Sequence, residues 1–375
     1  MAGSFIRRFT KWFFISLNIL GCIVFLLACL SPVVSPVQFG LSGFLALAAP
    51  YIIVSLVFSV IFWLIAKPAI ALVPVVTLLI GYKQVNVAFA WHPLNTFSKE
   101  SKSDSALRII SWNVRGMYGV STNDYKQKRN RNEIASLIND LNPDIICLQE
   151  FNNSISEKNK SAHNIDLFTG KCPHYYFSRD FKSKNLMFFG GSILFSKYPI
   201  IDSGKIKFPG NFAESLIYAD IVKGKDTIRV FTTHLQSFQF SETDYANIEK
   251  LKDPDAEALE ASENIYSKMK LAFTRRTEQA DMVRKTIDKS PYPSFVCGDF
   301  NDVPNSYTYF KIRGGLQDAF LATSFGIGKS YNALAPTLRI DYIMPDNNFN
   351  VTQFDMVDEG LSDHHMLVTD ISLKK

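Results

Sequence analysis

The sequence predicts an α+β domain preceded by a transmembrane helical segment, and three observations support this architecture. No charged residue occurs between Lys11 and Lys67, which is the composition of a membrane segment. After residue 106, many short runs rich in β-branched and aromatic residues are bounded by Gly, Pro, Asn or Asp, which predicts strands. Only two long stretches in that region have apolar residues at helical spacing, so we expect a β-sandwich flanked by helices.

Two hydrophobic stretches, at about 12–30 and 43–66, each reach the roughly 20 residues needed to cross a bilayer core of about 30 Å. Basic residues before the first stretch also suit a cleaved signal peptide. That apolar run is long for a signal peptide, however, and a second long run follows at once, so we favour a retained anchor. A third stretch, about 69–90, is uncharged only as far as Tyr82. We favour three spans, with two spans and an interfacial segment as the alternative.

Basic residues predict how these helices are oriented. Arg7, Arg8 and Lys11 precede the first stretch and Lys67 separates the second from the third, so all four are expected on the cytoplasmic side. Three spans would place everything after Trp91 outside the cytoplasm, whereas two spans would leave it inside. We therefore expect a multi-pass protein of the cytoplasmic (inner) membrane, with its large domain on the extracytoplasmic side.

A change in composition divides the chain into three parts. Residues 1–92 form the transmembrane region, 93–105 form a polar linker rich in Ser and Lys, and 106–375 form a single large domain. The rest of the chain from Lys99 onward is formally neutral, because five of the 40 basic residues and none of the 35 acidic residues precede Lys99. Proteins that bind nucleic-acid phosphates usually carry a basic surplus. A nucleic-acid partner is therefore disfavoured but stays open.

The large domain is expected to contain eight strands and two helices. The expected strands are 107–114, 144–150, 190–200, 215–222, 227–235, 294–300, 339–345 and 364–373. The expected helices, 126–142 and 263–290, are each followed directly by Pro. Five cysteines show no disulfide or zinc spacing, so we interpret them as buried structural thiols.

Polar residues lie at or beside the ends of these strands, where an apolar run stops. They are Asn113, Glu150, His234, Asp299, Asn301, Asp341, Asp363 and His364. A single Asn or Asp at such a place is usually a turn former. Strand ends converge on one edge of a sheet, however, and so many carboxylates, amides and imidazoles are costly to bury unless they are paired or hold a metal. The pattern therefore predicts one polar site, with His365 pointing away from it by strand alternation.

Seven blocks carry a resemblance to a known family: SWNVRG, PDIICLQE, GGSILFSKYPI, FTTHLQS, GDFND, RIDYIM and LSDHHMLV. In this order, over nearly all of residues 106–375, they resemble the endonuclease/exonuclease/phosphatase superfamily. It includes pancreatic-type deoxyribonucleases, abasic-site endonucleases, inositol-polyphosphate 5-phosphatases and neutral sphingomyelinases. The chain looks like a membrane-anchored, bacterial-type member. The resemblance implies a four-layer α/β/β/α sandwich that hydrolyses phosphate esters with Mg²⁺ or Mn²⁺.

The resemblance also implies a metal site. Carried over position by position, Glu150 looks like the principal metal ligand, with Asn113 and Asp363 close to the ion. Hard oxygen ligands with few protein donors suit Mg²⁺, which keeps several waters and lets a substrate phosphate complete its shell. We therefore expect a single divalent cation at this edge of the sheet.

The remaining polar residues resemble the family's catalytic groups. Asp341 looks like the partner that orients His364, which would hold the imidazole in one tautomer. Three further residues look like the groups that surround the scissile phosphate in this family: Asp299, Asn301 and His234. Either His364 or Asp299 would take the proton from the attacking water.

Two functions from different substrate classes remain. The anchor and the neutral domain favour a phosphoesterase acting on a lipid headgroup or another small phosphodiester or phosphomonoester. The frequency of nucleases in the family favours an endonuclease or exonuclease acting on DNA or RNA. A non-enzymatic scaffold is disfavoured because every motif position keeps its residue. The segment 236–266 is expected to be a solvated insertion, with a lid over the site as the sharper hypothesis, and no protein partner can be predicted.

Overall fold

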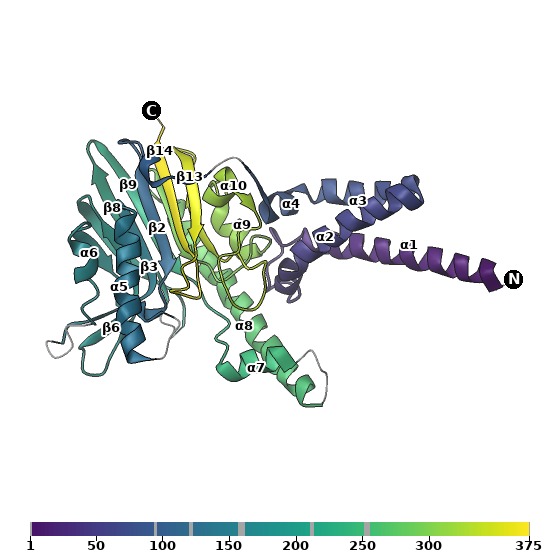
Figure 1. Cartoon of the computed structure of the whole chain (residues 1–375), viewed down its shortest axis with the longest axis horizontal. Coiled ribbons are helices and arrows are strands. Elements are labelled where there is room, and N and C mark those ends of the chain that lie inside the picture. Colours follow the sequence, from purple (N-terminus) through teal and green to yellow (C-terminus); the bar gives the residue numbers. More distant parts are fainter. Residues whose placement is uncertain are drawn as a thin grey trace.

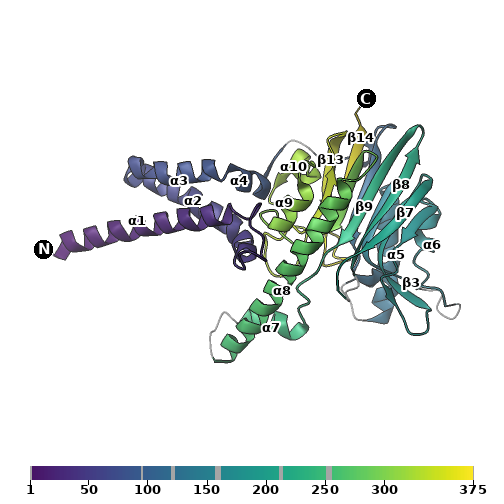
Figure 2. The same cartoon turned by 180° about the vertical axis from the view of Figure 1, so that it is seen from behind.

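The computed structural model describes residues 2–93, 96–119, 123–156, 162–210, 214–250 and 256–374. Two β-sheets pack face to face, helices cover their outer faces, and a group of N-terminal helices projects from one end (Figure 1). The view from behind in Figure 2 shows the same arrangement. The expected α+β, four-layer sandwich is therefore confirmed.

The first sheet has the strand order β13-β14-β2-β3-β6-β4, and β5 pairs with β6. Its strands are β2 (Leu107–Asn113), β3 (Ile145–Ser154), β4 (His174–Phe177), β5 (Phe181–Lys182), β6 (Phe188–Ser196), β13 (Phe349–Val357) and β14 (Met366–Leu373). β2 and β3 are parallel, whereas β14 is antiparallel to β2. The C-terminal ends of β2 and β3 and the start of β14 therefore lie at one edge of this sheet.

The second sheet has the strand order β12-β10-β9-β8-β7. Its strands are β7 (Ile200–Lys207), β8 (Ser215–Lys223), β9 (Asp226–His234), β10 (Ser294–Asp299) and β12 (Asp341–Pro345). β9 and β10 are parallel and end together, so that His234 lies opposite Asp299 in the register. Antiparallel β12 places Asp341 opposite Asp299 on the other side. Three site candidates from distant parts of the chain are thus neighbours on adjacent strands.

Helices cover both outer faces and the hydrophobic core fills three layers. The inner core between the sheets includes Ile109, Leu194 and Val230, all completely buried. The helices of the domain are α5 (Asp124–Asp140), α6 (Asp166–Thr169), α7 (Glu242–Lys250), α8 (Ala256–Ile287), α9 (Tyr307–Arg313) and α10 (Ala319–Thr323). Short elements complete the fold: β1 (Ala90–Trp91), β11 (Phe325–Gly326) and the 3-10 helices η1 (Lys99–Ser101) and η2 (Arg115–Met117).

Several boundaries differ from those expected. The strand predicted at 190–200 ends at Ser196, because a turn that leads to Pro199 follows and the next strand begins at Ile200. The strand at Phe349–Val357 was not predicted, since it pairs only with β14 and its burial does not alternate strictly. In the segment predicted as a polar linker, residues 99–101 form η1.

Two N-terminal helices are long and apolar enough to cross a membrane. α1 spans Ala2–Ala28 and α2 spans Ser42–Ala66, close to the stretches expected at 12–30 and 43–66. α1 begins earlier than expected because its basic first turns are also helical. Length and composition alone support this membrane assignment.

The third hydrophobic stretch differs from the single helix expected at 69–90. It forms α3 (Pro68–Ile80) and α4 (Tyr82–Ala88), which are bent by 73° relative to each other. Gly81 lies at the bend, where a Cβ atom would be only 2.2 Å from the Phe25 ring of α1. Close packing of α1 therefore accompanies the break. The pair is a third span only if both helices are taken together, so the number of spans stays a prediction.

The N-terminal helical group contacts the domain through buried polar groups. Asn305 is the centre of these contacts: its backbone carbonyl accepts from Ser31 Oγ at 2.5 Å, and its Nδ2 donates to the Gln84 side chain at 2.6 Å. Arg339 Nη2 donates to the carbonyl of Val87 at 2.8 Å. The domain is thus attached at the end of the helices where α1 stops and α2 begins (Figure 1).

A buried ion pair ties the first sheet together. Arg108 of β2 and Asp370 of β14 form two hydrogen bonds of 2.8 Å, and their side chains are 1% and 0% exposed. We expect Arg108→Met to lower the free energy of unfolding by about 3–5 kcal/mol, because the Asp370 carboxylate would stay buried without a positive charge, and only the neutral Gln353 side chain would still donate to it. Urea denaturation of the full chain in detergent, followed by tryptophan fluorescence, measures this change.

Arg129→Met provides the matched control for this prediction. Arg129 pairs with Glu133 on the surface of α5, where the side chains are 62% and 47% exposed. Exposed pairs of this kind contribute about 1 kcal/mol or less. Equal destabilisation by the two substitutions would contradict the role given to the buried pair.

Candidate active site

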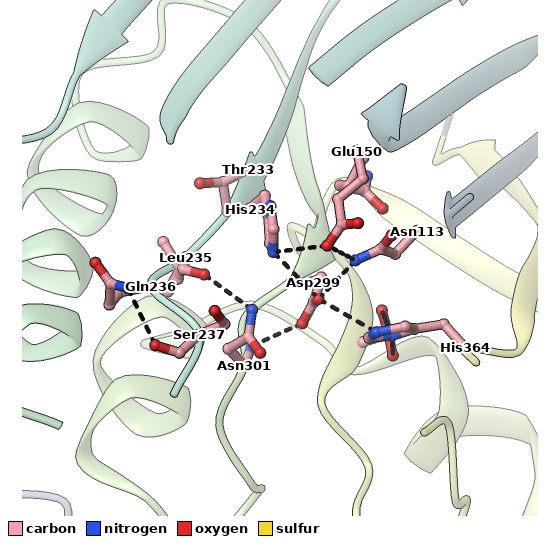
Figure 3. A network of polar contacts seen from close by, with 12 residues as sticks. Asn113, Glu150, Thr233, His234, Leu235, Gln236, Ser237, Asp299, Asn301 and His364 are labelled. Carbon is pink, nitrogen blue, oxygen red and sulfur yellow. Dashed lines mark hydrogen bonds and ion pairs between the residues drawn. The ribbon is translucent and has the colours of Figure 1, made fainter. Parts of the chain in front are cut away.

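A pocket of about 200 Å³ lies where the strand ends of both sheets meet. Figure 3 shows the polar network at this place, with side chains from β2, β3, β9 and β10 pointing toward one another. The parallel pairs β2/β3 and β9/β10 explain the convergence, because parallel neighbours end at the same edge of a sheet. The fold therefore delivers polar strand ends from both sheets to one spot.

Asp299 is the centre of the network and its side chain is 1% exposed. Its Oδ2 accepts from Asn113 Nδ2 at 3.1 Å and lies 3.5 Å from His234 Nε2 and 3.7 Å from His364 Nε2. Its Oδ1 accepts from the backbone N–H of Asn301 at 2.8 Å. One carboxylate thus joins groups from both sheets.

Glu150 reaches the pocket because β3 is irregular at this position. The register of β3 against β6 shifts between Leu148 and Phe151, and Glu150 has a φ of 51°. A positive φ is uncommon outside glycine and marks a conformation held by its surroundings. Glu150 Oε1 accepts from Asn113 Nδ2 at 3.1 Å and lies 3.8 Å from His234 Nε2. The side chain is 44% exposed, so its carboxylate is open to a ligand.

Asp341 and His364 form a buried pair. His364 Nδ1 lies 3.0 Å from Asp341 Oδ2, which also accepts from Ser330 Oγ at 2.7 Å. Burial alone would lower the pKa of His364, but the carboxylates of Asp341 and Asp299 outweigh it and raise that pKa to about 10. Burial raises the pKa of Asp341, and His364 acts against this increase. Each partner of the pair therefore favours the charged form of the other.

Asn301 and Asp363 complete the predicted set. Asn301 has a φ of 52°, and its Nδ2 donates to the carbonyl of Leu235 at 2.9 Å, which joins the turns after β9 and β10. Asp363 is 28% exposed, and its Oδ2 lies 3.6 Å from Arg115 Nη1. Both residues line the pocket.

The structure brings all eight predicted residues to one site. Six of them line the pocket: Glu150, His234, Asp299, Asn301, Asp363 and His364. The other two, Asn113 and Asp341, hydrogen-bond to pocket residues. His365 lies away from the pocket, since its Nε2 is 2.9 Å from Asn332 Oδ1.

Tyr331 is a site residue that the sequence did not indicate. Its ring lies against the His364 imidazole, with ring centroids 4.8 Å apart, and its hydroxyl is 3.0 Å from the hydroxyl of Tyr245. Tyr331 lies in a loop without periodic pattern and Ser330 precedes it, so no sequence signal marked either residue.

The segment after His234 borders the pocket. Phe238, Phe240 and Tyr245 all line it, and Arg276 lies over the Phe238 ring at 4.6 Å. The described part of this segment therefore lies beside the pocket, where a lid over the site would have to lie. Residues 251–255, in the acidic part of the segment, lie outside the described residues.

Two groups of residues in the described part of the chain could hold a cation. Asp299, Asp341 and His364 place ligand atoms within 4.8 Å of one another. The Nδ1 atom of His364 already contacts Asp341, however, so this group forms a hydrogen-bonded chain. Glu150 offers an accessible carboxylate instead, and its exposure leaves room for the waters that Mg²⁺ retains.

Asn113 and Asp363 add oxygen donors near Glu150. The three side chains supply two carboxylates and one amide: Asn113 Nδ2 donates to Glu150 Oε1, and Asn113 Oδ1 accepts from the backbone N–H of Arg115. Carboxylate and amide oxygens are the ligands of hard divalent cations, whereas thiolates and imidazoles favour softer metals. The donor chemistry of Glu150, Asn113 and Asp363 therefore fits Mg²⁺ or Mn²⁺.

The model of the Endonuclease/Exonuclease/phosphatase family matches residues 110–364. The chain belongs to this family. Its members are metal-dependent hydrolases that act on phosphoester bonds, so the protein is a divalent-metal-dependent hydrolase of this type. Residues 10–88 match a second family model, described as a domain of unknown function.

Solved structures share the fold at low sequence identity. An endonuclease/exonuclease/phosphatase from Beutenbergia cavernae is 20% identical, with a TM-score of 0.50 and 72% of each chain covered. The human Nocturnin catalytic domain with bound sulfate is 16% identical, with a TM-score of 0.49 over 74% of this chain and 98% of that one. D. rerio TDP2 complexed with a single-strand DNA product is 18% identical, with a TM-score of 0.49 over 72% of this chain and 100% of that one. No curated protein matches the chain. The likeness to the Beutenbergia cavernae structure supports the fold and leaves the substrate open.

Proposed function

We propose that this family member is a membrane-anchored, Mg²⁺- or Mn²⁺-dependent phosphoesterase that hydrolyses a lipid headgroup phosphate or another small phosphodiester or phosphomonoester. The observation that carries the proposal is the convergence of carboxylates, amides and imidazoles in one pocket beside the membrane helices. The neutral charge of residues 99–375 supports a small ester over a nucleic acid.

Glu150, Asn113 and Asp363 would hold the divalent cation. When bound, the cation polarises a phosphoryl oxygen and offsets the negative charge of the transition state. The three residues come from different strand ends and from the turn before β14, so the folded domain assembles them before any ligand arrives.

Asp299 is the group that we assign as the base for the attacking water. Its carboxylate is anchored by the side chain of Asn113 and the backbone of Asn301, so it needs no reorganisation to accept a proton. His364 has a carboxylate near each ring nitrogen, an arrangement that stabilises the imidazolium. We therefore assign it to donate a hydrogen bond to a phosphate oxygen.

His234 and Asn301 are assigned to the phosphate itself. His234 lies between Glu150 and Asp299, with its Nε2 directed to both carboxylates. Asn301 borders the pocket and is fixed by its bond to Leu235. Hydrogen-bond donors at this place stabilise charge that develops on the phosphoryl oxygens.

The arrangement of the helices supports three spans with the domain outside the cytoplasm. α1 ends and α2 begins beside the domain, whereas the N-terminus and the turn between α2 and α3 lie at the far end (Figure 1). Arg7, Arg8, Lys11 and Lys67 belong to that far end of the helical group, and such residues favour the cytoplasmic side. A C-terminal topology reporter tests this: periplasmic activity is expected, and cytoplasmic activity would reopen intracellular nucleic acid as the substrate.

The activity itself is tested with the purified full chain in detergent. We expect Mg²⁺-dependent turnover of a p-nitrophenyl phosphodiester and of phospholipid vesicles, little cleavage of plasmid DNA, and complete loss of turnover with EDTA. Plasmid cleavage without turnover of the small ester or the lipid would favour the alternative, a nuclease. Turnover that persists in EDTA would contradict the metal site.

Glu150→Gln separates metal binding from the other roles. Removing one carboxylate is expected to raise the Mg²⁺ concentration for half-maximal activity by about 10–100-fold. Glu133→Gln is the matched control, since Glu133 lies on the surface of α5 at 47% exposure. An unchanged Mg²⁺ requirement in Glu150→Gln would remove Glu150 from the metal site.

A further inference from the structure

The pocket has an apolar wall in addition to its catalytic groups. The apolar wall is formed by Leu47, Val303, Leu334, Leu338 and Ile340. These side chains are aliphatic, so the chemistry that they complement is hydrocarbon. A small hydrophilic phosphate ester would leave this wall in contact with water. The wall therefore indicates that part of the ligand is hydrocarbon.

The apolar wall is continuous with a membrane helix. Leu47 belongs to α2, and its neighbour Ala46 is completely buried against Val303 and Ile340. Further along the same helix, Tyr51 is hydrogen-bonded to Thr337 at 3.2 Å. Tyr51 lies nine residues beyond the start of α2 at Ser42, which is about 14 Å of helix. The pocket-lining loop 331–340 thus follows α2 toward the bilayer.

Other apolar contacts hold the domain against the same helices. Phe44 of α2 stacks on Tyr266 of α8, with ring centroids 5.0 Å apart, and Tyr266 is 42% exposed. Phe89, which follows α4, contacts Trp91 and Phe325, and both of these are more than half exposed. Exposed aromatic residues beside transmembrane helices are typical of the membrane interface. This end of the domain, with the pocket in it, therefore faces the bilayer surface.

The size of the pocket limits how much of a lipid it can hold. Its volume of about 200 Å³ is smaller than the roughly 300–1,000 Å³ of pockets that enclose whole drug-sized ligands. The pocket can enclose a phosphate and the first atoms attached to it. A longer chain has to continue past Leu47 along α2.

We propose that the substrate is an amphiphilic phosphate ester taken from the bilayer, whose phosphate lies between Glu150 and Asp299 and whose hydrocarbon lies against Leu47 and Leu334. This inference rests on the proposed phosphoesterase function and adds that α2 is part of the substrate site. The membrane segment is then a wall of the catalytic pocket as well as an anchor.

The test compares two substrates that differ only in hydrocarbon. The full chain in detergent is assayed with Mg²⁺ on methyl p-nitrophenyl phosphate and on hexyl p-nitrophenyl phosphate, which share the leaving group. We expect kcat/KM to be at least about tenfold higher for the hexyl ester, because each buried methylene adds binding energy. Leu47→Gln is expected to reduce this hexyl-to-methyl ratio by at least about threefold.

Two further variants keep the test decisive. Leu334 is 46% exposed, so Leu334→Gln is expected to fold normally and to reduce the ratio as well. Leu41 is 50% exposed and precedes α2 outside the pocket lining, so Leu41→Gln is the matched control with an unchanged ratio.

The outcomes distinguish this inference from the proposed function. No turnover of either ester would overturn the phosphoesterase proposal itself. Turnover of both esters at equal kcat/KM would overturn the amphiphile inference and leave the phosphoesterase intact. A high hexyl-to-methyl ratio of kcat/KM that neither Leu47→Gln nor Leu334→Gln reduces would also overturn the inference. The preference for the hexyl ester would then come from the detergent micelle.

Discussion

Replacing His364 with glutamine is expected to lower kcat for phosphodiester hydrolysis by about 10³-fold, within the range of about 10²–10⁴ that a positioned acid or base contributes. The physical reason is the place of the imidazole: Nδ1 contacts Asp341, and Nε2 lies 3.7 Å from Asp299 in the pocket. Glutamine can donate a hydrogen bond but carries no charge. Steady-state kinetics with saturating Mg²⁺, together with the melting temperature, measure the effect.

A double-mutant cycle shows whether Asp341 acts through His364. Asp341→Asn alone is expected to lower kcat by about 10–10²-fold, because the imidazolium loses the carboxylate that orients and stabilises it. In the His364→Gln background the same substitution should add almost nothing, since groups that act as a unit are not additive. Equal effects in both backgrounds would contradict the pairing.

His365→Gln is the matched control for the His364 substitution. His365 is the next residue in the chain, but its Nε2 contacts Asn332 and lies 3.2 Å from Asp358 rather than facing the pocket. The kcat of His365→Gln is expected to stay within about twofold of the wild-type value, because polar contacts of this kind outside the pocket contribute little to stability. A loss as large as that of His364→Gln would show that the two roles have been interchanged.

Gly298→Ala is expected to destabilise the domain by about 3 kcal/mol or more. Gly298 precedes Asp299 in β10 and has a φ of 133°, which L-residues rarely adopt. A Cβ atom there would lie 2.0 Å from the carbonyl oxygen of Thr233 in the neighbouring strand β9. Because backbone cannot move aside as a flexible side chain can, the two strands would have to separate at the site. Urea denaturation in detergent measures the loss.

Gly315→Ala is the control for the glycine substitution. A Cβ atom at Gly315 would meet nothing within 4 Å, and Gly315 is not among the residues with a positive φ. The free energy of unfolding of Gly315→Ala is therefore expected to differ from the wild-type value by less than about 1 kcal/mol. A Gly298→Ala variant that is as stable as Gly315→Ala would show that β9 and β10 tolerate wider spacing here.

The N-terminal helical region shows what composition can predict and what it cannot. The absence of charge between Lys11 and Lys67 predicted two long apolar helices, because hydropathy over about 20 residues is a local property. The break at Gly81 was not predicted. It accompanies the packing of Phe25, a residue of another helix, against the glycine.

The sequence by itself determined the class of the fold, and it predicted the eight polar residues that the structure brings together. Strand pattern, turn residues and polar positions at strand ends are local signals, and Asn113 and Asp299 are examples of residues marked in this way. Only the tertiary structure decided that the β3 irregularity turns Glu150 toward Asn113, that Tyr331 lies on His364, and that Leu47 lines the pocket. These features depend on contacts between residues far apart in the chain, and no short stretch of sequence encodes the space into which a side chain will point.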